Sequence, residues 1–224
     1  MIKISNRISK TLYTFFCFIQ RKRLKNHDIT IISQNCLGGV IYHDLGLQFK
    51  SPTINLWIEE KDFFKFACHL KYYLSRELHF VQGIDETPTA YLDDVLIHFN
   101  HYSSEEEAAS KWNERTKRVN YDNVFVLCSD RRTRGELPTE EDIALLKDVN
   151  VAGKCVFTNK KINGLEYLHR ATPDVNENCV TKMMFEECKY LPLKKWQLYF
   201  DYVFWLNTGH FRKTLMLKLI EKPK

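Results

Sequence analysis

Short apolar runs rich in β-branched residues alternate with stretches of helical periodicity along most of the chain. This alternation is typical of parallel strands that are joined by crossover helices. The sequence therefore predicts an α/β fold with an open, mainly parallel sheet and helices on both faces. The expected strands are 29–32, 53–58, 95–99, 124–127 and 155–158, and the expected helices between them are 37–47, 61–78, 104–119 and 140–149.

The starts of two of these helices carry a capping signal. Ser104 is followed by three glutamates, and Thr139 is followed by three acidic residues. A hydroxyl at this position binds a free backbone N–H of the first turn, and acidic side chains there favour the positive end of the helix dipole. Residues 196–206 are apolar and aromatic almost throughout, which predicts a buried segment and favours a helix.

The N-terminal segment has a helical pattern of its own. Apolar residues recur there at helical spacing, with lysines and arginines between and after them: Ile8, Leu12, Phe15, Phe16 and Ile19. This pattern predicts a basic amphipathic helix. The expected organisation is this helix at residues 1–26, followed by a single α/β domain at residues 27–224.

Two interpretations of the N-terminal helix remain open. Residues 8–25 could form a peripheral anchor on an anionic membrane, or the helix could pack against the domain. The apolar stretch at residues 12–19 is far shorter than the roughly 20 residues that span a bilayer. No small-residue cleavage site follows it, so export is not expected. The expected location is the cytoplasm, and in the anchor interpretation the protein would also contact the inner face of the membrane.

Length, charge and cysteine content narrow the picture further. The chain has 224 residues and no internal linker, which is long enough for one sizeable core. The formal net charge is +5, and the first 25 residues hold seven lysines and arginines but no acid. The remainder is nearly balanced, so no nucleic-acid partner is expected. The seven cysteines include no C-x-x-C pair, which indicates reduced thiols and no structural zinc site.

Polar residues gather just after the predicted strands. In an open parallel sheet, ligands bind outside the carboxyl ends of the strands, so these residues are candidates for a functional site. Loops are also polar without any function, and that interpretation remains open. The segments concerned are 33–36, 98–102, 129–132 and 158–160.

The turn after the first predicted strand is the most informative of these segments. It places Ser33, Asn35 and Cys36 at the start of a helix, where free N–H groups and the helix dipole can hold an anion or an oxyanion. We expect the pKa of Cys36 to be lowered there, which favours a thiolate nucleophile. Gly38 and Gly39 permit close approach of backbone or ligand. In the alternative interpretation, Ser33 and Asn35 only cap the helix and Cys36 is packed.

Candidate partners for this turn follow the third predicted strand. His98 and Asn100 point to one side of that strand, and His101 falls in the turn after it. Either histidine could serve as a general base for Ser33 or Cys36 if the fold brings the side chains together. Each histidine could equally be structural.

Three further residues complete the predicted site. Asp130 is suited to orient a histidine, and Arg131 is suited to bind a phosphate or carboxylate, unless the two form a surface ion pair. His43, on the helix after the first strand, ranks second as a substrate-binding residue. No metal is expected, because His98 and His101 do not form a standard ligand pair and no further ligand is specified.

Several of these stretches together resemble a bacterial family of exopolysaccharide or capsule biosynthesis proteins, whose biochemical activity is unknown. The resemblance runs from Asp28 to near the C-terminus and rests on ITIISQNCLGG (29–39), YHDLG (42–46), SPTINL (51–56), IHFNHY (97–102), KWNER (111–115) and YDN (121–123). The resemblance implies a role in the synthesis of surface polysaccharides but does not specify the reaction. The Asn35-Cys36 element also resembles another polysaccharide-biosynthesis family, thought to use coenzyme A, and loosely resembles esterase folds. The chain lacks the Gly-Asp-Ser start and Asp-x-x-His close of those esterases, which puts a serine nucleophile in doubt.

The resulting hypothesis is a transferase that moves an acyl group from a thioester donor, such as a coenzyme A thioester, to a hydroxyl of a glycan or glycolipid acceptor. Ser33 or Cys36 would be the nucleophile, or would form the oxyanion site with Asn35, and Arg131 would bind the donor phosphate. A glycosyltransferase is the near alternative, although the LDD segment at 92–94 only weakly replaces an Asp-x-Asp metal signature. The remaining alternative is a non-catalytic glycan-binding or assembly protein of the capsule machinery.

Overall fold

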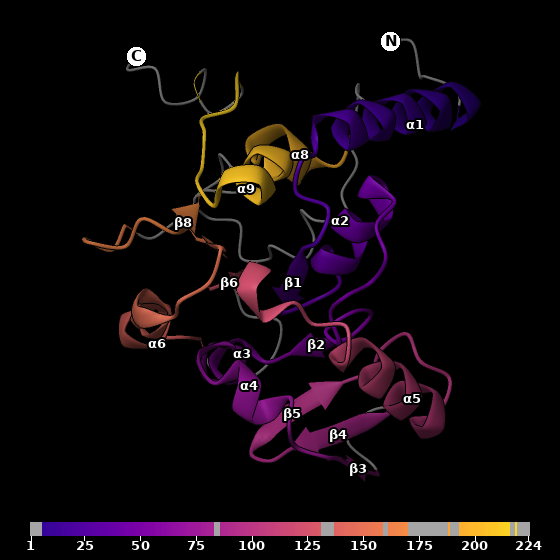
Figure 1. Cartoon of the computed structure of the whole chain (residues 1–224), viewed down its shortest axis with the longest axis vertical. Coiled ribbons are helices and arrows are strands. Elements are labelled where there is room, and N and C mark those ends of the chain that lie inside the picture. Colours follow the sequence, from indigo (N-terminus) through magenta and orange to yellow (C-terminus); the bar gives the residue numbers. More distant parts are fainter. Residues whose placement is uncertain are drawn as a thin grey trace.

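A four-stranded parallel sheet forms the centre of the computed structural model (Figure 1). The structure describes residues 6–82, 86–130, 137–158, 161–169, 188, 193–215 and 218. All neighbouring strands of this sheet are parallel. Its order is β1-β6-β7-β8, with β1 Thr30–Ser33, β6 Val124–Ser129, β7 Gly153–Phe157 and β8 Leu168–His169. The strands predicted at 29–32, 124–127 and 155–158 are thereby confirmed.

The parallel sheet separates two apolar cores. All six residues of β6 are buried, as expected for a strand with neighbours on both sides and covered faces. Val124, Val126 and Cys128 lie in one core, whereas Phe125 and Leu127 lie in the other. This division follows the two-residue period of a strand.

Helices cover both faces of the parallel sheet. The core that contains Phe125 is closed by α2 Leu37–Leu45, α8 Lys195–Tyr199 and α9 Tyr202–Thr208. Residues of the opposite core come from α3 Glu60–Cys68, α4 Leu70–Tyr73, α5 Glu105–Thr116, α6 Glu140–Ala144 and the 3₁₀ helix η2 Leu145–Asp148. The N-terminal helix α1 Asn6–Arg23 packs on α2, and the 3₁₀ helix η1 Tyr121–Asn123 leads into β6.

A second sheet corrects the prediction of one mainly parallel sheet. It is antiparallel and has the order β2-β5-β4-β3, with β2 Trp57–Ile58, β3 Leu78–Val81, β4 Thr89–Leu92 and β5 Val95–His98. The strands predicted at 53–58 and 95–99 therefore pair with each other in this second sheet. Figure 1 shows the second sheet and α5 at the end of the molecule opposite α1.

A tight turn explains why these strands are antiparallel. β4 and β5 are joined by Asp93 and Asp94, and Leu92 pairs with Val95 across them. Asp93 has a φ of 58°, in the left-handed region that two-residue hairpin turns use and that aspartate tolerates. The two aspartates, considered above as a weak metal signature, instead form a turn whose carboxylates bind side chains of α3 and α4.

Most of the predicted helices are confirmed with altered bounds. The helix predicted at 61–78 is interrupted at His69, whose φ is −119°, and is divided into α3 and α4. The segment 196–206 forms α8 and α9, and the side chain of Asp201 caps the second of them. Both predicted N-terminal caps, on α5 and α6, are present.

Gln34 joins the two sheets beside the end of β1. Its carbonyl oxygen accepts a hydrogen bond from the backbone N–H of Ile58 in β2 at 2.9 Å. Its side-chain Oε1 accepts from the backbone N–H of Ser129, at the end of β6, at 3.0 Å. Because Gln34 is buried, both bonds form away from water and fix the relative position of the three strands.

Candidate functional site at the carboxyl edge of the parallel sheet

The carboxyl edge of the parallel sheet is lined with polar side chains that are almost fully buried. Ser33 ends β1, Ser129 and Asp130 lie at the end of β6, Thr158 follows β7 and His169 ends β8. Their exposed fractions range from 0% for Ser33 to 6% for His169. Burial of polar groups costs free energy unless they are hydrogen-bonded, so the contacts of each residue decide what this edge can do.

Asp130 lies in the middle of this edge. Its strand, β6, is flanked by β1 and β7, and its backbone N–H donates to the carbonyl oxygen of Phe157 at 3.2 Å. The hydroxyl of Thr158 donates to Asp130 Oδ2 at 2.6 Å. A buried acid thus ties the ends of β6 and β7 together, at the edge where open α/β sheets bind their ligands.

A second buried carboxylate, that of Glu60, lies near the same strand. Glu60 begins α3 and is 1% exposed. Burial raises the pKa of the Cys128 thiol in β6, and the negative charges of Asp130 and Glu60 both add to that rise. Glu60 was not among the predicted site residues, although it lies two positions after the apolar run that forms β2.

Ser33 forms a side-chain hydrogen bond with the first turn of α2. Its side chain is fully buried, and its Oγ accepts from the backbone N–H of Gly38 at 3.2 Å. Its own N–H donates to Thr53 Oγ1 at 2.9 Å. A Cβ on Gly38 would lie only 2.7 Å from Ser33 Cβ, so the glycine lets the helix begin against the strand. A Cβ on Gly39 would lie 3.5 Å from the Ile54 side chain, which is an ordinary van der Waals contact.

Asn35 and Cys36 also serve the start of α2. Asn35 Oδ1 accepts from the backbone N–H of Leu37 at 3.0 Å. Cys36 is the residue before the helix, and its Sγ lies 4.0 Å from the carbonyl oxygen of Leu56. The predicted lowering of the Cys36 pKa is wrong: burial raises the pKa of this thiol, and its backbone hydrogen bond opposes the rise only in part. Desolvation of the thiolate outweighs the helix terminus here.

The Cys36 thiol is therefore expected to react more slowly with iodoacetamide at neutral pH than the exposed thiol of N-acetylcysteine. The thiolate is the reactive form, so the rate should rise only when the pH passes above the ordinary range of cysteine. Timed alkylation followed by peptide mass spectrometry separates Cys36 from the other cysteines. Faster reaction than the reference at neutral pH would restore the case for a thiolate nucleophile.

His98 ends β5 of the antiparallel sheet, Asn100 lies in the turn after it, and both contact Trp57. His98 is 2% exposed, and its ring stacks on the Trp57 ring with centroids 3.8 Å apart. Trp57 Nε1 donates to Asn100 Oδ1 at 2.9 Å. Trp57 pairs with His98, and the next residue, Ile58, bonds to Gln34. The turn after β1 and the end of β5 are thus connected through β2.

The remaining predicted residues lie elsewhere. His101 is exposed in the turn after β5. His43 is exposed on the last turn of α2, with Nδ1 3.7 Å from Asp44 Oδ1. It is roughly 8 Å along the helix axis from Gly38, at the far end from the β1 turn. Arg131 lies outside the described residues.

Comparison with known proteins assigns the chain to a family. The family model described as "Domain of unknown function (DUF1919)" matches residues 7–207. The chain belongs to the DUF1919 family. It is also similar to a Haemophilus influenzae protein, with 35% identity over 205 residues that cover 92% of this chain and 97% of the relative. That relative is named "Uncharacterized protein", and neither description connects the DUF1919 chain with exopolysaccharide or capsule synthesis.

His169 is an edge residue that the sequence pattern of this DUF1919 chain did not reveal. Its strand, β8, has two residues and is defined only by pairing with β7, where Leu168 lies opposite Val156. The His169 ring stacks on Phe211, with centroids 4.8 Å apart. Among the described residues, no group of three or more histidine, cysteine, aspartate or glutamate side chains is arranged to hold a metal ion.

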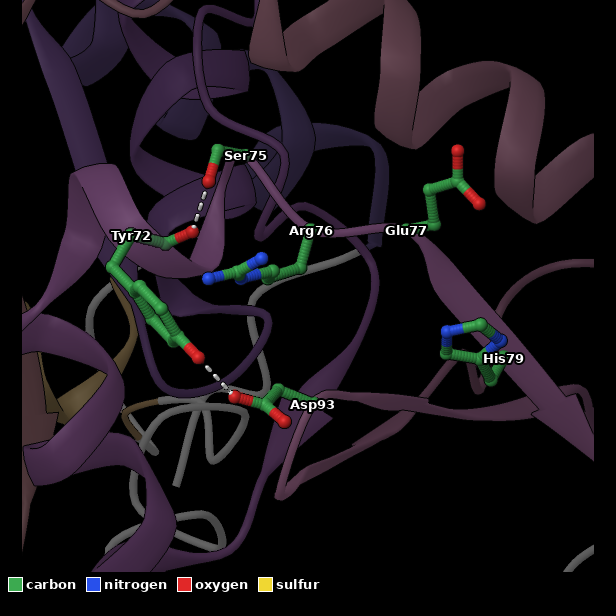
Figure 2. Close-up of a pocket in the computed structure, with 6 residues that line it drawn as sticks. All are labelled: Tyr72, Ser75, Arg76, Glu77, His79 and Asp93. Carbon is green, nitrogen blue, oxygen red and sulfur yellow. Dashed lines mark hydrogen bonds between the residues drawn. The ribbon is translucent and has the colours of Figure 1, made fainter.

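Surface cavities of the DUF1919 chain occur outside this edge. One cavity of about 530 Å³ is lined by Tyr72, Ser75, Arg76, Glu77, His79 and Asp93 (Figure 2). The Arg76 guanidinium lies 4.2 Å from the centre of the Tyr72 ring, and the Tyr72 hydroxyl donates to Asp93. Another cavity, of about 430 Å³, lies between β7 and the segment after α9, beside Lys154 and Phe211. The described linings of both cavities contain none of the predicted site residues.

Proposed function

We propose that this DUF1919 chain is a transferase of bacterial surface-polysaccharide synthesis, which moves an acyl group from a coenzyme A thioester to a hydroxyl of a glycan or glycolipid. The observation that carries the proposal is the buried carboxylate of Asp130, bonded to Thr158 at the carboxyl edge of the parallel sheet. The pathway is supported by the sequence resemblance to exopolysaccharide biosynthesis proteins, which includes residues 29–39 and 97–102. The donor is a cytoplasmic metabolite, which places the reaction in the cytoplasm.

Direct transfer suits the turn after β1 better than a covalent intermediate. A nucleophilic side chain must reach the acyl carbon and lose its proton. Ser33 Oγ is held by a hydrogen bond from the Gly38 N–H at the start of α2, and burial raises the pKa of Cys36. Neither side chain is prepared for attack, so the sugar hydroxyl itself attacks the thioester.

In this mechanism Asp130 is the general base. Its carboxylate takes the proton of the sugar hydroxyl while the hydroxyl oxygen bonds to the carbonyl carbon of the thioester. The carbon–sulfur bond then breaks, and its electron pair leaves with the donor sulfur. That thiolate takes the proton back from Asp130, so the products are a sugar ester and the free thiol of coenzyme A.

Donor binding provides the first experiment. Thermal unfolding of the purified chain is recorded with acetyl-coenzyme A, with a nucleotide-sugar, and with ADP as a control for the nucleotide alone. Selective binding of a ligand to the folded state stabilises it by about 2.7 kcal/mol at a concentration of one hundred times Kd. We expect acetyl-coenzyme A to raise Tm by several degrees, and the nucleotide-sugar and ADP to raise it much less.

The other outcomes contradict acyl transfer in different ways. A rise in Tm with the nucleotide-sugar alone would mean that the protein transfers a glycosyl group, and no acyl group, to the same acceptor. A shift of equal size with ADP means that only a nucleotide is bound. No shift with any of the three leaves a non-catalytic glycan-binding or assembly protein as the better account of the fold.

A further inference from the structure

Helix α1 exposes the large apolar side chains that a packed helix normally buries. Exposed fractions reach 60% at Phe15 and 52% at Phe18. Residues at positions i, i+4, i+7 and i+11 share one face of a helix, and this spacing unites the exposed apolar set: Ile8, Leu12, Phe15 and Ile19, with Phe18 beside them. We call these five residues the apolar face of α1. In the part of the chain that the structure describes, no other helix exposes such a group.

The opposite side of α1 is held to the domain by apolar and polar contacts, and Phe16 packs there against the core of α2, α8 and α9. Cys17 and Gln20 are buried there, and the Tyr13 hydroxyl donates to the buried Asp44 of α2 at 2.7 Å. Arg23 binds Asp201 at 2.7 Å, at the start of α9. α1 is therefore fixed in orientation with its apolar face turned away from α2. Figure 1 shows α1 at one end of the molecule.

Positive charge accompanies this apolar face. The first acidic residue of the chain is Asp28, whereas seven lysines and arginines precede it. Lys10, Lys22 and Lys25 are exposed, and Lys22 Nζ lies 5.6 Å from the centre of the Phe18 ring. The lysine stem can thus lie along the apolar face while its ammonium group extends beyond it.

We propose that the apolar face of α1 docks the protein on the surface of a membrane that contains anionic phospholipid. Interfacial helices insert apolar side chains at the boundary of headgroups and acyl chains, and their lysines and arginines bind anionic headgroups. Within the described residues, no helix is long and apolar enough to cross a bilayer, so α1 lies along the surface. The inference is independent of the proposed function.

Charge also decides between a membrane and a second copy of the chain. A symmetric dimer through this face would place two α1 helices together, each with basic residues and no acid within the helix. Like charges across such an interface oppose association, whereas an anionic surface is complementary to them. The lipid surface is therefore the occupant that the side chains favour.

Vesicle sedimentation tests the proposal on the full chain. The protein is mixed with vesicles of phosphatidylcholine alone or with added phosphatidylglycerol, and the bound fraction is measured in the pellet. We expect at least about tenfold stronger partitioning onto the anionic vesicles, decreasing as salt is raised. Lys10→Gln and Lys22→Gln should each weaken partitioning by roughly fivefold.

A matched pair of variants separates this face from general surface hydrophobicity. Leu12→Gln with Phe15→Gln should reduce binding to anionic vesicles by about tenfold or more. The control is Leu137→Gln with Leu145→Gln, which removes two leucines that are 57% and 51% exposed elsewhere and should bind like the native chain. Circular dichroism confirms that each variant is folded.

Two results overturn the proposal. One is equal pelleting with neutral and anionic vesicles. The other is a dimer in solution that dissociates on substitution of Leu12 and Phe15, because a second copy would then be the occupant of the apolar face.

Discussion

Replacing Asp130 by asparagine is expected to slow acyl transfer by at least about a hundredfold, because an amide cannot accept the proton of the sugar hydroxyl. The substitution conserves the shape of the side chain, and the amide oxygen can still accept from Thr158, which donates to Oδ2 in the native protein. The fold should therefore persist. Release of free coenzyme A thiol from acetyl-coenzyme A, in the presence of a glycan acceptor, measures the rate.

Two further substitutions make this result specific. Asp122→Asn changes an exposed acid in η1 in the same way and should leave the rate unchanged. Glu60→Gln alters the other buried carboxylate near Cys128. If the rate falls with Glu60→Gln and survives with Asp130→Asn, the base is Glu60 and the role given to Asp130 is wrong. If both variants keep the native rate, neither carboxylate takes part in catalysis.

Much of the parallel sheet could be predicted from local pattern. β1, β6 and β7 are buried apolar runs, and helices lie between them along the chain, as parallel pairing requires. β8 could not be predicted in this way, because two residues carry no periodicity and become a strand only by pairing with β7. β3 is only partly buried and directly follows a helical pattern, so its first residue, Leu78, falls inside the helix predicted at 61–78 and the other three carry no strand signal of their own.

The candidate site shows the same division between local and tertiary information. The strand-end rule selected Ser33 and Asp130, which the fold places at one edge. The rule could not show that His98 ends a strand of another sheet, because parallel and antiparallel pairing look alike in a short apolar run. The sign of the Cys36 pKa shift was also beyond local reasoning. A helix start is visible in sequence, but the burial that raises this pKa depends on tertiary packing, in which Leu56, twenty positions away, brings its carbonyl oxygen to 4.0 Å from Cys36 Sγ.

Replacing Trp205 by alanine is expected to lower the free energy of unfolding by about 3–5 kcal/mol, as for other fully buried aromatic residues. Trp205 is 0% exposed in α9, and its ring meets Phe125 of β6 edge-on with centroids 5.0 Å apart. Phe200 lies on another side at 5.4 Å. Urea unfolding followed by circular dichroism measures the loss. The control Leu145→Ala, at a residue 51% exposed, should change it by less than about 0.5 kcal/mol.

Gly153 in β7 provides a more specific test of the contact between Phe125 and Trp205. A Cβ there would lie 2.6 Å from Phe125 Cδ1 and 3.0 Å from Trp205 Nε1, so Gly153→Ala should cost about 1–3 kcal/mol by overpacking. With Trp205 shortened to alanine, the Phe125 ring gains space to move away from the added methyl group. The double variant should therefore lose less than the sum of the single losses, by about 1 kcal/mol. Strict additivity would mean that the Phe125 ring is held by its other neighbours and that Trp205 does not determine its position.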